Sequence, residues 1–165
     1  MELAPLLGAD VGFMTIDSPM ALAWGRGERL LPLPVLASRP VVLVTPPFGV
    51  STKDAYSWLA RDRGGYEPRG TVLAPTDLDT WEGIERVAIN DFEDVVGRRH
   101  PEIPAIVDSL RTAGGSPALM SGSGSTVFGV FADAAKADAA AAQLRRHEFG
   151  HVLLTRSADR VERVA

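Results

Sequence analysis

One run of glycine and hydroxyl residues has the pattern best suited to chemistry in this chain. Residues 121–126 read Ser-Gly-Ser-Gly-Ser-Thr and stand between two short apolar runs, 117–120 and 127–131. Glycine lets a backbone approach a bound group closely, and successive free N–H groups in such a turn form a concavity that binds anions. The same spacing also suits a hairpin turn that binds nothing. The loop does not open a helix, so neither the Walker nor the Rossmann fingerprint applies.

The sequence after residue 40 predicts the strands and helices that hold this loop. Val41–Thr45 is a β-branched run typical of a buried strand, and Ser51 or Thr52 can cap the helix that follows it. Further helices are expected over 80–89, from Pro101 to the glycine pair at 114–115, and from Asp133 to about residue 146. The two runs beside the loop and residues 152–154 supply the remaining strands. This order predicts an α+β fold, a ferredoxin-like split βαβ sandwich with an expanded helical first crossover.

The tetrapeptide Asn90-Asp91-Phe92-Glu93 has the spacing of a capping box, because Glu93 follows Asn90 by three residues. We therefore assign these polar residues to helix capping rather than to chemistry.

The first forty residues form a separate segment. A helix over 2–7 is expected to end at Gly8, and residues 20–24 and 29–33 flank Gly25-Arg26-Gly27 as a hairpin would. Prolines at 32, 34 and 40 then mark a seam between two substructures.

Composition limits the class of function. The chain has 165 residues, 45% hydrophobic and 23% charged, with a net charge of −4, which is typical of a soluble globular protein without a nucleic-acid footprint. It has no cysteine, its three histidines show no metal-ligand spacing, and no apolar run reaches membrane-spanning length. We expect a cytoplasmic protein that holds no metal through its own side chains and acts on neither nucleic acid nor membranes.

Several segments together resemble one enzyme family. They are Leu7-Gly8-Ala9-Asp10-Val11, Gly25-Arg26-Gly27-Glu28, Val50-Ser51-Thr52 with Tyr56, Asn90-Asp91-Phe92-Glu93 and residues 121–128. In this order they are similar to the 4-diphosphocytidyl-2-C-methyl-D-erythritol kinases, within the superfamily of galactokinase, homoserine kinase, mevalonate kinase and phosphomevalonate kinase (GHMP). The glycine loop indicates the superfamily. The Gly-Ala-Asp element and the Ser-Thr-x-x-x-Tyr spacing indicate this particular kinase.

The resemblance also implies a division of the chain. Members of the family begin with an N-terminal domain that carries a lysine and the main phosphate loop, and no such sequence is found here. We expect residues 1–38 to be a remnant of that domain, residues 41–165 to be the C-terminal ferredoxin-like domain, and the chain to be an incomplete fragment of the enzyme.

The resemblance implies a catalytic role for Asp10. The aspartate of the Gly-Ala-Asp element would orient the acceptor hydroxyl and accept its proton. Gly12 departs from the family, which usually has proline there. Without the resemblance, Asp10 reads as a residue that closes the turn after Gly8.

By the same resemblance, Gly122, Ser123 and Gly124 would shape the region of the ATP phosphates, with Mg²⁺ bridging those phosphates. Arg26 reads most simply as a turn residue, although it could also lie near phosphate.

Thr52 and Tyr56 are expected to contact the substrate. They stand one helical turn apart, so both can face the same side. In the family the matching aromatic stacks on the cytosine of the substrate, and the matching threonine lies near the same ligand, a small molecule with a cytidine diphosphate group. The alternatives are an N-cap role for Thr52 and ordinary packing for Tyr56.

The sequence is compatible with two alternative functions. The first is ATP-dependent phosphorylation of a hydroxyl of 4-diphosphocytidyl-2-C-methyl-D-erythritol, in non-mevalonate isoprenoid precursor synthesis. The alternative is a free-standing, non-catalytic ferredoxin-like module that binds a ligand or a partner.

We expect the 165-residue chain alone to have little or no kinase activity, because the sequence that would form most of the ATP site is missing from it. A phosphorylation assay with the purified chain, ATP and 4-diphosphocytidyl-2-C-methyl-D-erythritol tests this expectation. Turnover at a rate typical of small-molecule kinases would contradict it.

Overall fold

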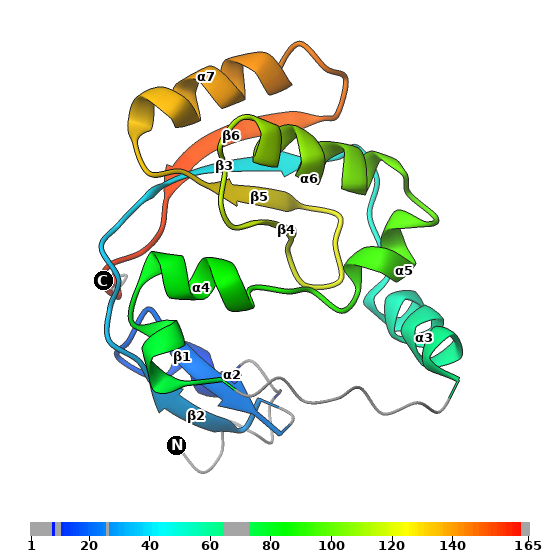
Figure 1. The fold of residues 1–165 in the computed structure, drawn as a ribbon. Helices are drawn as coiled ribbons and strands as arrows, with labels where there is room; N and C mark the ends of the chain where they lie inside the picture. Colours follow the sequence, from blue (N-terminus) through cyan, green and yellow to red (C-terminus); the bar gives the residue numbers. More distant parts are fainter. Residues whose placement is uncertain (1–7, 9–10, 26, 65–72, 163–165) are drawn as a thin grey trace. The chain divides into compact units, whose positions relative to one another are not determined.

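The computed structural model describes residues 8, 11–25, 27–64 and 73–162. The chain divides into two compact units (Figure 1). The first takes the described residues of 1–38, 74–84 and 158–165, and the second those of 39–73 and 85–157. The domain limits expected from the sequence stay a prediction. The helix expected over 2–7, Asp10 and Arg26 all lie outside the described residues.

The first unit contains the predicted hairpin. Strands β1 (Ala21–Trp24) and β2 (Arg29–Pro32) pair antiparallel, with Ala21 opposite Pro32 and Trp24 opposite Arg29. The turn between them uses glycines at φ 72° and 98°, positions 25 and 27, where a side chain would be strained.

Three further elements belong wholly or partly to the first unit. A short helix, α2 (Val11–Met14), precedes the hairpin and was not expected from the sequence. A 3₁₀ turn, η1 (Pro75–Leu78), leads into helix α4 (Trp81–Val87), whose start belongs to this unit. The Trp81 indole donates a hydrogen bond to the Ala37 carbonyl at 2.8 Å, and this bond ties α4 to the segment after the hairpin.

The second unit is built on one antiparallel sheet. Its strands are β3 (Pro40–Thr45), β4 (Ala118–Met120), β5 (Val127–Val130) and β6 (His151–Arg156), in the order β4-β5-β3-β6. The first strand in sequence is therefore central, between the third and the fourth, which is the ferredoxin-like arrangement. The predicted α+β fold is confirmed, including the expanded first crossover.

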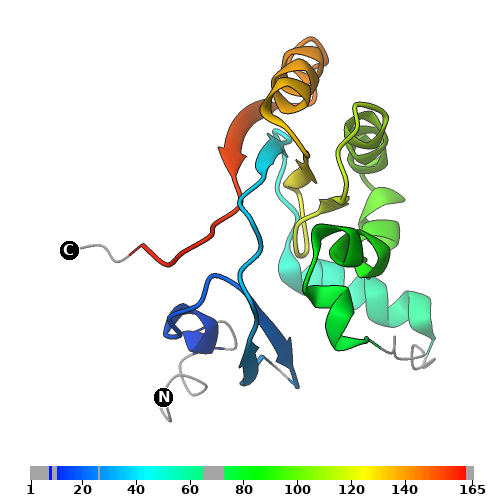
Figure 2. The same cartoon turned by 60° about the vertical axis from the view of Figure 1, so that its left-hand side comes forward.

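The helices of this unit supply its two crossovers. The first crossover contains α3 (Thr52–Arg63), the end of α4, α5 (Glu93–Gly97) and α6 (Glu102–Thr112), and the second is α7 (Ala134–Leu144). Helix α6 contacts β4 and β5, while α7 contacts β3 and β6. Both helices therefore cover the same face of the sheet (Figure 2). No helix among the described residues is long and apolar enough to cross a membrane.

The core lies between the sheet and these two helices. Alternate residues of β3, Val42 and Val44, are fully buried, as the two-residue period of a strand requires. They meet the apolar stripe of α6 at positions 103, 106, 107 and 110, spaced at helical intervals, and the small-residue face of α7. The alanines of α7 let that helix approach the sheet closely.

We expect Leu110→Ala to lower the free energy of unfolding of the second unit by about 2–5 kcal/mol, because Leu110 is fully buried and its truncation leaves a cavity. Urea unfolding followed by circular dichroism measures the change. The matched control is Ala105→Gln at an exposed position of the same helix, which should change stability by at most about 0.5 kcal/mol. Equal effects of the two substitutions would contradict this account of the core.

Candidate functional site

The glycine loop joins β4 to β5 in the second unit, as the sequence predicted. Its ends are closed by a hydrogen bond from the Ser121 N–H to the Thr126 carbonyl, 2.8 Å, and its tip by one from the Gly124 N–H to the Ser121 carbonyl, 2.9 Å. Gly122 and Gly124 have φ of 54° and 90°, in the left-handed region that favours glycine. The glycines are therefore required by the shape of the loop itself.

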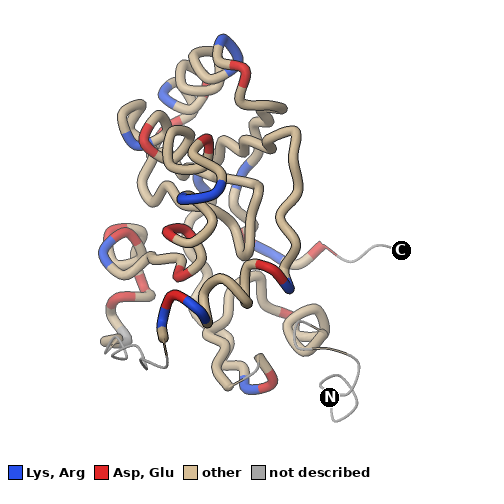
Figure 3. The backbone as a smooth tube through the Cα atoms, turned by 90° about the vertical axis from the view of Figure 1, so that its right-hand side faces the viewer, with Lys and Arg blue, Asp and Glu red and all other residues tan. Residues whose placement is uncertain are grey.

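The loop carries no charged side chain, and none occurs between residues 112 and 132. The backbone tube is therefore tan over this stretch, without the blue and red of charged residues (Figure 3). Within the described part of the chain, the N–H groups of Gly122 and Ser123 donate to no protein group. What the loop offers to an anion is thus backbone N–H groups and hydroxyls.

The start of α3 lies directly beside this loop. Ser51 is the N-cap and its hydroxyl accepts from the Asp54 N–H at 3.3 Å, so capping belongs to Ser51 and not to Thr52. The Thr52 hydroxyl instead lies 3.0 Å from the Ser123 hydroxyl, a hydrogen-bond distance. Two predicted site residues, 71 positions apart in sequence, are therefore in contact, next to the positive end of a helix dipole.

Tyr56 lies one turn further along α3. Its side chain is 60% exposed, so it is not a core residue. Its ring meets the ring of Phe92 edge to face, with centroids 4.9 Å apart. The contact steadies the tyrosine while leaving most of it open to solvent, a condition that suits a stacking surface.

A buried serine fixes the far side of the loop. Ser125 is 8% exposed, and its hydroxyl donates to the Phe48 carbonyl at 2.5 Å. Phe48 in turn stacks on His100 with ring centroids 4.5 Å apart. The sequence analysis missed this anchor, because nothing local marks which serine of the loop is the buried one.

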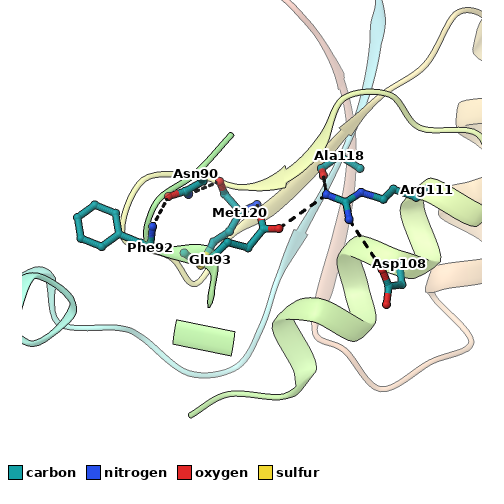
Figure 4. A network of polar contacts seen from close by, with 7 residues as sticks. All are labelled: Asn90, Phe92, Glu93, Asp108, Arg111, Ala118 and Met120. Carbon is teal, nitrogen blue, oxygen red and sulfur yellow. Dashed lines mark hydrogen bonds and ion pairs between the residues drawn. The ribbon is translucent and has the colours of Figure 1, made fainter. Parts of the chain in front are cut away.

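The tetrapeptide at residues 90–93 does not form the predicted capping box. Helix α5 begins at Glu93 after Phe92, with no side-chain cap, and spans five residues. The Glu93 carboxylate accepts from the Met120 N–H at 2.9 Å, and the Asn90 amide donates to the Met120 carbonyl at 2.7 Å (Figure 4). The same amide nitrogen also donates to the Gly122 carbonyl at 2.8 Å. The capping-box prediction was wrong because the Glu93 carboxylate bonds to the edge of β4 and not to the N–H of Asn90, while the Asn90 side-chain oxygen accepts from the Phe92 N–H.

The side chains of Asn90 and Glu93, which bind the end of β4 and the start of the loop, are called the clamp. Two hollows lie beside this clamp. One, of about 430 Å³, is lined by the first half of the glycine loop together with residues such as Asn90, Phe92 and Phe128. The other, of about 670 Å³, is lined largely by charged side chains, among them Asp62, Arg63 and Arg111. The first has Ser121 and Gly122 of the loop in its wall, and neither hollow is lined by Thr52, Tyr56 or Ser123.

The predicted catalytic residue and the question of metal ligation are two further parts of the site. Asp10 lies outside the described residues, so its catalytic role stays a prediction. Among the described residues, no three His, Asp or Glu side chains gather closely enough to hold a metal ion.

Comparison with known proteins gives consistent matches. Residues 77–149 match the family model described as GHMP kinases C terminal. A 4-diphosphocytidyl-2-C-methyl-D-erythritol kinase of Citrifermentans bemidjiense is 38% identical over 146 residues, covering 88% of this chain and 50% of that protein. One from Pelotomaculum thermopropionicum is 41% identical over 165 residues, covering 95% and 54%. A crystal structure of 4-(cytidine 5'-diphospho)-2C-methyl-D-erythritol kinase matches with a TM-score of 0.72 and 32% identity, covering 94% of this chain and 55% of that one.

The ferredoxin-like sheet, the glycine loop between its strands and these matches define the class: the chain belongs to the GHMP kinases and contains their C-terminal domain. Within that class its relatives are the 4-diphosphocytidyl-2-C-methyl-D-erythritol kinases. The resemblance found in the sequence motifs is confirmed. The chain spans about half the length of the curated relatives it matches.

We expect Gly124→Ala to destabilise the loop more than Gly49→Ala. A Cβ at Gly124 would lie 2.7 Å from the Met120 sulfur, at a φ that costs an alanine about 1–2 kcal/mol. At Gly49 a Cβ meets nothing within 4 Å, so that substitution serves as the control. Thermal unfolding and amide hydrogen exchange of residues 120–126 measure the difference. Equal protection of the loop in both variants would contradict the expectation.

Proposed function

We propose that this chain forms the glycine-loop and acceptor-binding part of an ATP-dependent kinase that phosphorylates a hydroxyl of 4-diphosphocytidyl-2-C-methyl-D-erythritol. The observation that carries the proposal is the 3.0 Å contact between the hydroxyls of Thr52 and Ser123. It joins the start of α3, one turn from the exposed Tyr56, to a loop with free backbone N–H groups. A surface for a base and a surface for phosphate are thereby adjacent on one unit.

The phosphate side of the proposed site rests on backbone donors. Phosphoryl transfer depends mainly on positioning and on stabilising charge, and N–H groups fixed before the ligand arrives serve both needs. The N–H groups of Gly122 and Ser123 and the start of α3 provide such donors. ATP, bound together with Mg²⁺, supplies the phosphoryl group. We assign Mg²⁺ to the ATP phosphates because the resemblance to the related kinases implies that place for it.

The acceptor side has two proposed parts. Tyr56 stacks on the cytosine ring, and Thr52 contacts the same substrate from one helical turn away. Asp10 orients the acceptor hydroxyl and takes up its proton as the phosphoryl group is transferred, a role for which a carboxylate within hydrogen-bond reach is suited. The support for Asp10 is its match to the Gly-Ala-Asp element of the related kinases.

A cytidine nucleotide should therefore bind the chain through Tyr56. We expect Tyr56→Leu to weaken the binding of CDP about 5- to 150-fold, the equivalent of about 1–3 kcal/mol for stacking of a base on an aromatic ring. Tyr56→Phe should bind nearly as well as the unaltered chain, because stacking needs the ring and not the hydroxyl. Isothermal titration calorimetry with CDP and with UDP measures both affinity and base preference.

The matched control is Trp24→Leu, which removes an exposed aromatic from the first unit and should leave CDP binding unchanged. Unaltered CDP affinity in Tyr56→Leu would remove the cytosine-binding role. No binding of CDP by the unaltered chain at millimolar concentration would count against the proposed acceptor site as a whole.

A further inference from the structure

Strand β4 lies at the edge of its sheet, and the clamp on the glycine loop sits on that edge. The Ser121 N–H points toward β5 and donates to the Thr126 carbonyl. Successive backbone groups of a strand point in opposite directions, so the N–H and carbonyl of Met120 point outward from the sheet. These are the groups that an unprotected edge strand leaves unpaired.

Two side chains from one short segment satisfy both outward groups of Met120. The Glu93 carboxylate accepts its N–H at 2.9 Å, and the Asn90 amide donates to its carbonyl at 2.7 Å. Figure 4 shows the two side chains reaching the strand from neighbouring positions. The segment thus closes the edge as a further strand would, but with side-chain groups.

The carboxamide of Asn90 is fixed in one orientation. Its oxygen accepts from the Phe92 N–H at 2.9 Å, so its nitrogen must face the loop, where it donates to the carbonyls of Met120 and Gly122. A group that supplies one acceptor and two donors in fixed directions is an amide, and none of aspartate, serine or leucine can replace it completely.

Charged neighbours hold the other half of the clamp. The second oxygen of Glu93 lies 3.7 Å from the Arg111 guanidinium, which also donates to the Ala118 carbonyl at 3.1 Å and lies 3.9 Å from the Asp108 carboxylate. All of these groups are drawn in Figure 4. Arg111 thereby links Ala118, at the start of β4, to Glu93, which binds Met120 at the end of that strand.

The bond from Asn90 to Gly122 has a consequence for the next residue. The carbonyl of Gly122 and the N–H of Ser123 belong to one peptide unit, which is planar and trans, so the two groups point in opposite directions. Turning the Gly122 carbonyl toward Asn90 therefore turns the Ser123 N–H away from it. That N–H is one of the two that donate to no group among the described residues.

We propose that Asn90 is a positioning residue that sets the direction of the Ser123 N–H and so prepares the glycine loop to receive a phosphate group. The residue acts through the loop and does not touch the ligand. Its use in phosphate binding rests on the proposed function, whereas its control of the Ser123 peptide is a property of the ligand-free chain.

The two halves of the Asn90 carboxamide can be separated by substitution. Asn90→Ser keeps a side-chain oxygen that can accept from the Phe92 N–H but removes the donors to the loop. Asn90→Asp also keeps the acceptor and places a carboxylate against the Met120 and Gly122 carbonyls, which it repels. Asn90→Ser introduces no charge, so a shared effect of both variants cannot come from repulsion between a new carboxylate and a phosphate.

The control for local disturbance is Asp91→Asn. Asp91 is the adjacent residue, is more than half exposed, and its carboxylate pairs with Arg63 at 2.8 Å. A fourth variant, Asn90→Asp combined with Asp91→Asn, keeps the net charge and the composition of the chain unchanged, so an effect that it shares with Asn90→Ser does not come from added charge.

The first readout is the amide spectrum of the ligand-free 165-residue chain. We expect Asn90→Ser and Asn90→Asp to shift the ¹H–¹⁵N resonances of Gly122 and Ser123, because the peptide between them loses the bond that fixes its direction. The resonances of core residues such as Val42 and Phe131 should stay in place, which shows that the variants are folded. Unmoved resonances of Gly122 and Ser123 in both variants, or equal shifts in Asp91→Asn, would overturn the proposal.

The second readout is the affinity for inorganic pyrophosphate, with CDP as the comparison ligand. We expect both Asn90 variants to weaken pyrophosphate binding at least fivefold and to change CDP binding less. Equal losses for both ligands would mean a general structural role and would overturn the positioning role. If the unaltered chain binds neither ligand, the proposed function fails, and the amide spectrum still decides whether Asn90 directs the Ser123 peptide.

Discussion

The central position of β3 is the constraint on which the second unit depends. This strand pairs on one side with β5 and on the other with β6, elements more than eighty residues further along the chain. Its residues Val42 and Val44 are fully buried, so the ladder hydrogen bonds and the apolar core meet in the same few residues. Because β3 holds β5 in register, it also fixes where the loop between β4 and β5 emerges. The geometry of the candidate site is therefore set from the core outward.

The loop is held on three sides by contacts of different kinds. The buried Ser125 hydroxyl attaches it to Phe48, Thr52 meets Ser123 at the start of α3, and Asn90 binds the carbonyls on the remaining side. All three partners belong to the first crossover, the segment that is expanded relative to a minimal split βαβ unit. The long crossover thus supplies the surroundings of the loop, while the second crossover, α7, serves the core alone. The first crossover therefore contributes both to the core, through α6, and to the surroundings of the loop.

Most of the fold could be predicted from local patterns in the sequence. The β-branched run of β3, the N-cap Asp133 of α7 and the glycines between β4 and β5 each determine a structure within a few residues, and all were predicted. The contacts that shape the site were harder to predict. Asn90 and Met120 are thirty residues apart, and no periodicity reveals that a strand edge will be available to an amide. The roles of Asp10, Thr52 and Tyr56 were reached through family resemblance, because each residue type also has an ordinary structural use at its position.

The uncharged groups that hold the glycine loop, Asn90, Thr52 and Ser125, also determine how the loop responds to ionic strength. Hydrogen bonds made by an uncharged amide and by hydroxyls are almost insensitive to the ionic atmosphere, which screens charges over about 8 Å at physiological salt. The ion pair between the half-exposed Arg111 and the more buried Glu93, at 3.7 Å, is the part of this network that salt can weaken. A loop shaped mainly by Asn90, Ser125 and Thr52 therefore keeps its form across a wide range of salt concentrations. An organism that accumulates ions under osmotic stress would retain the same loop geometry.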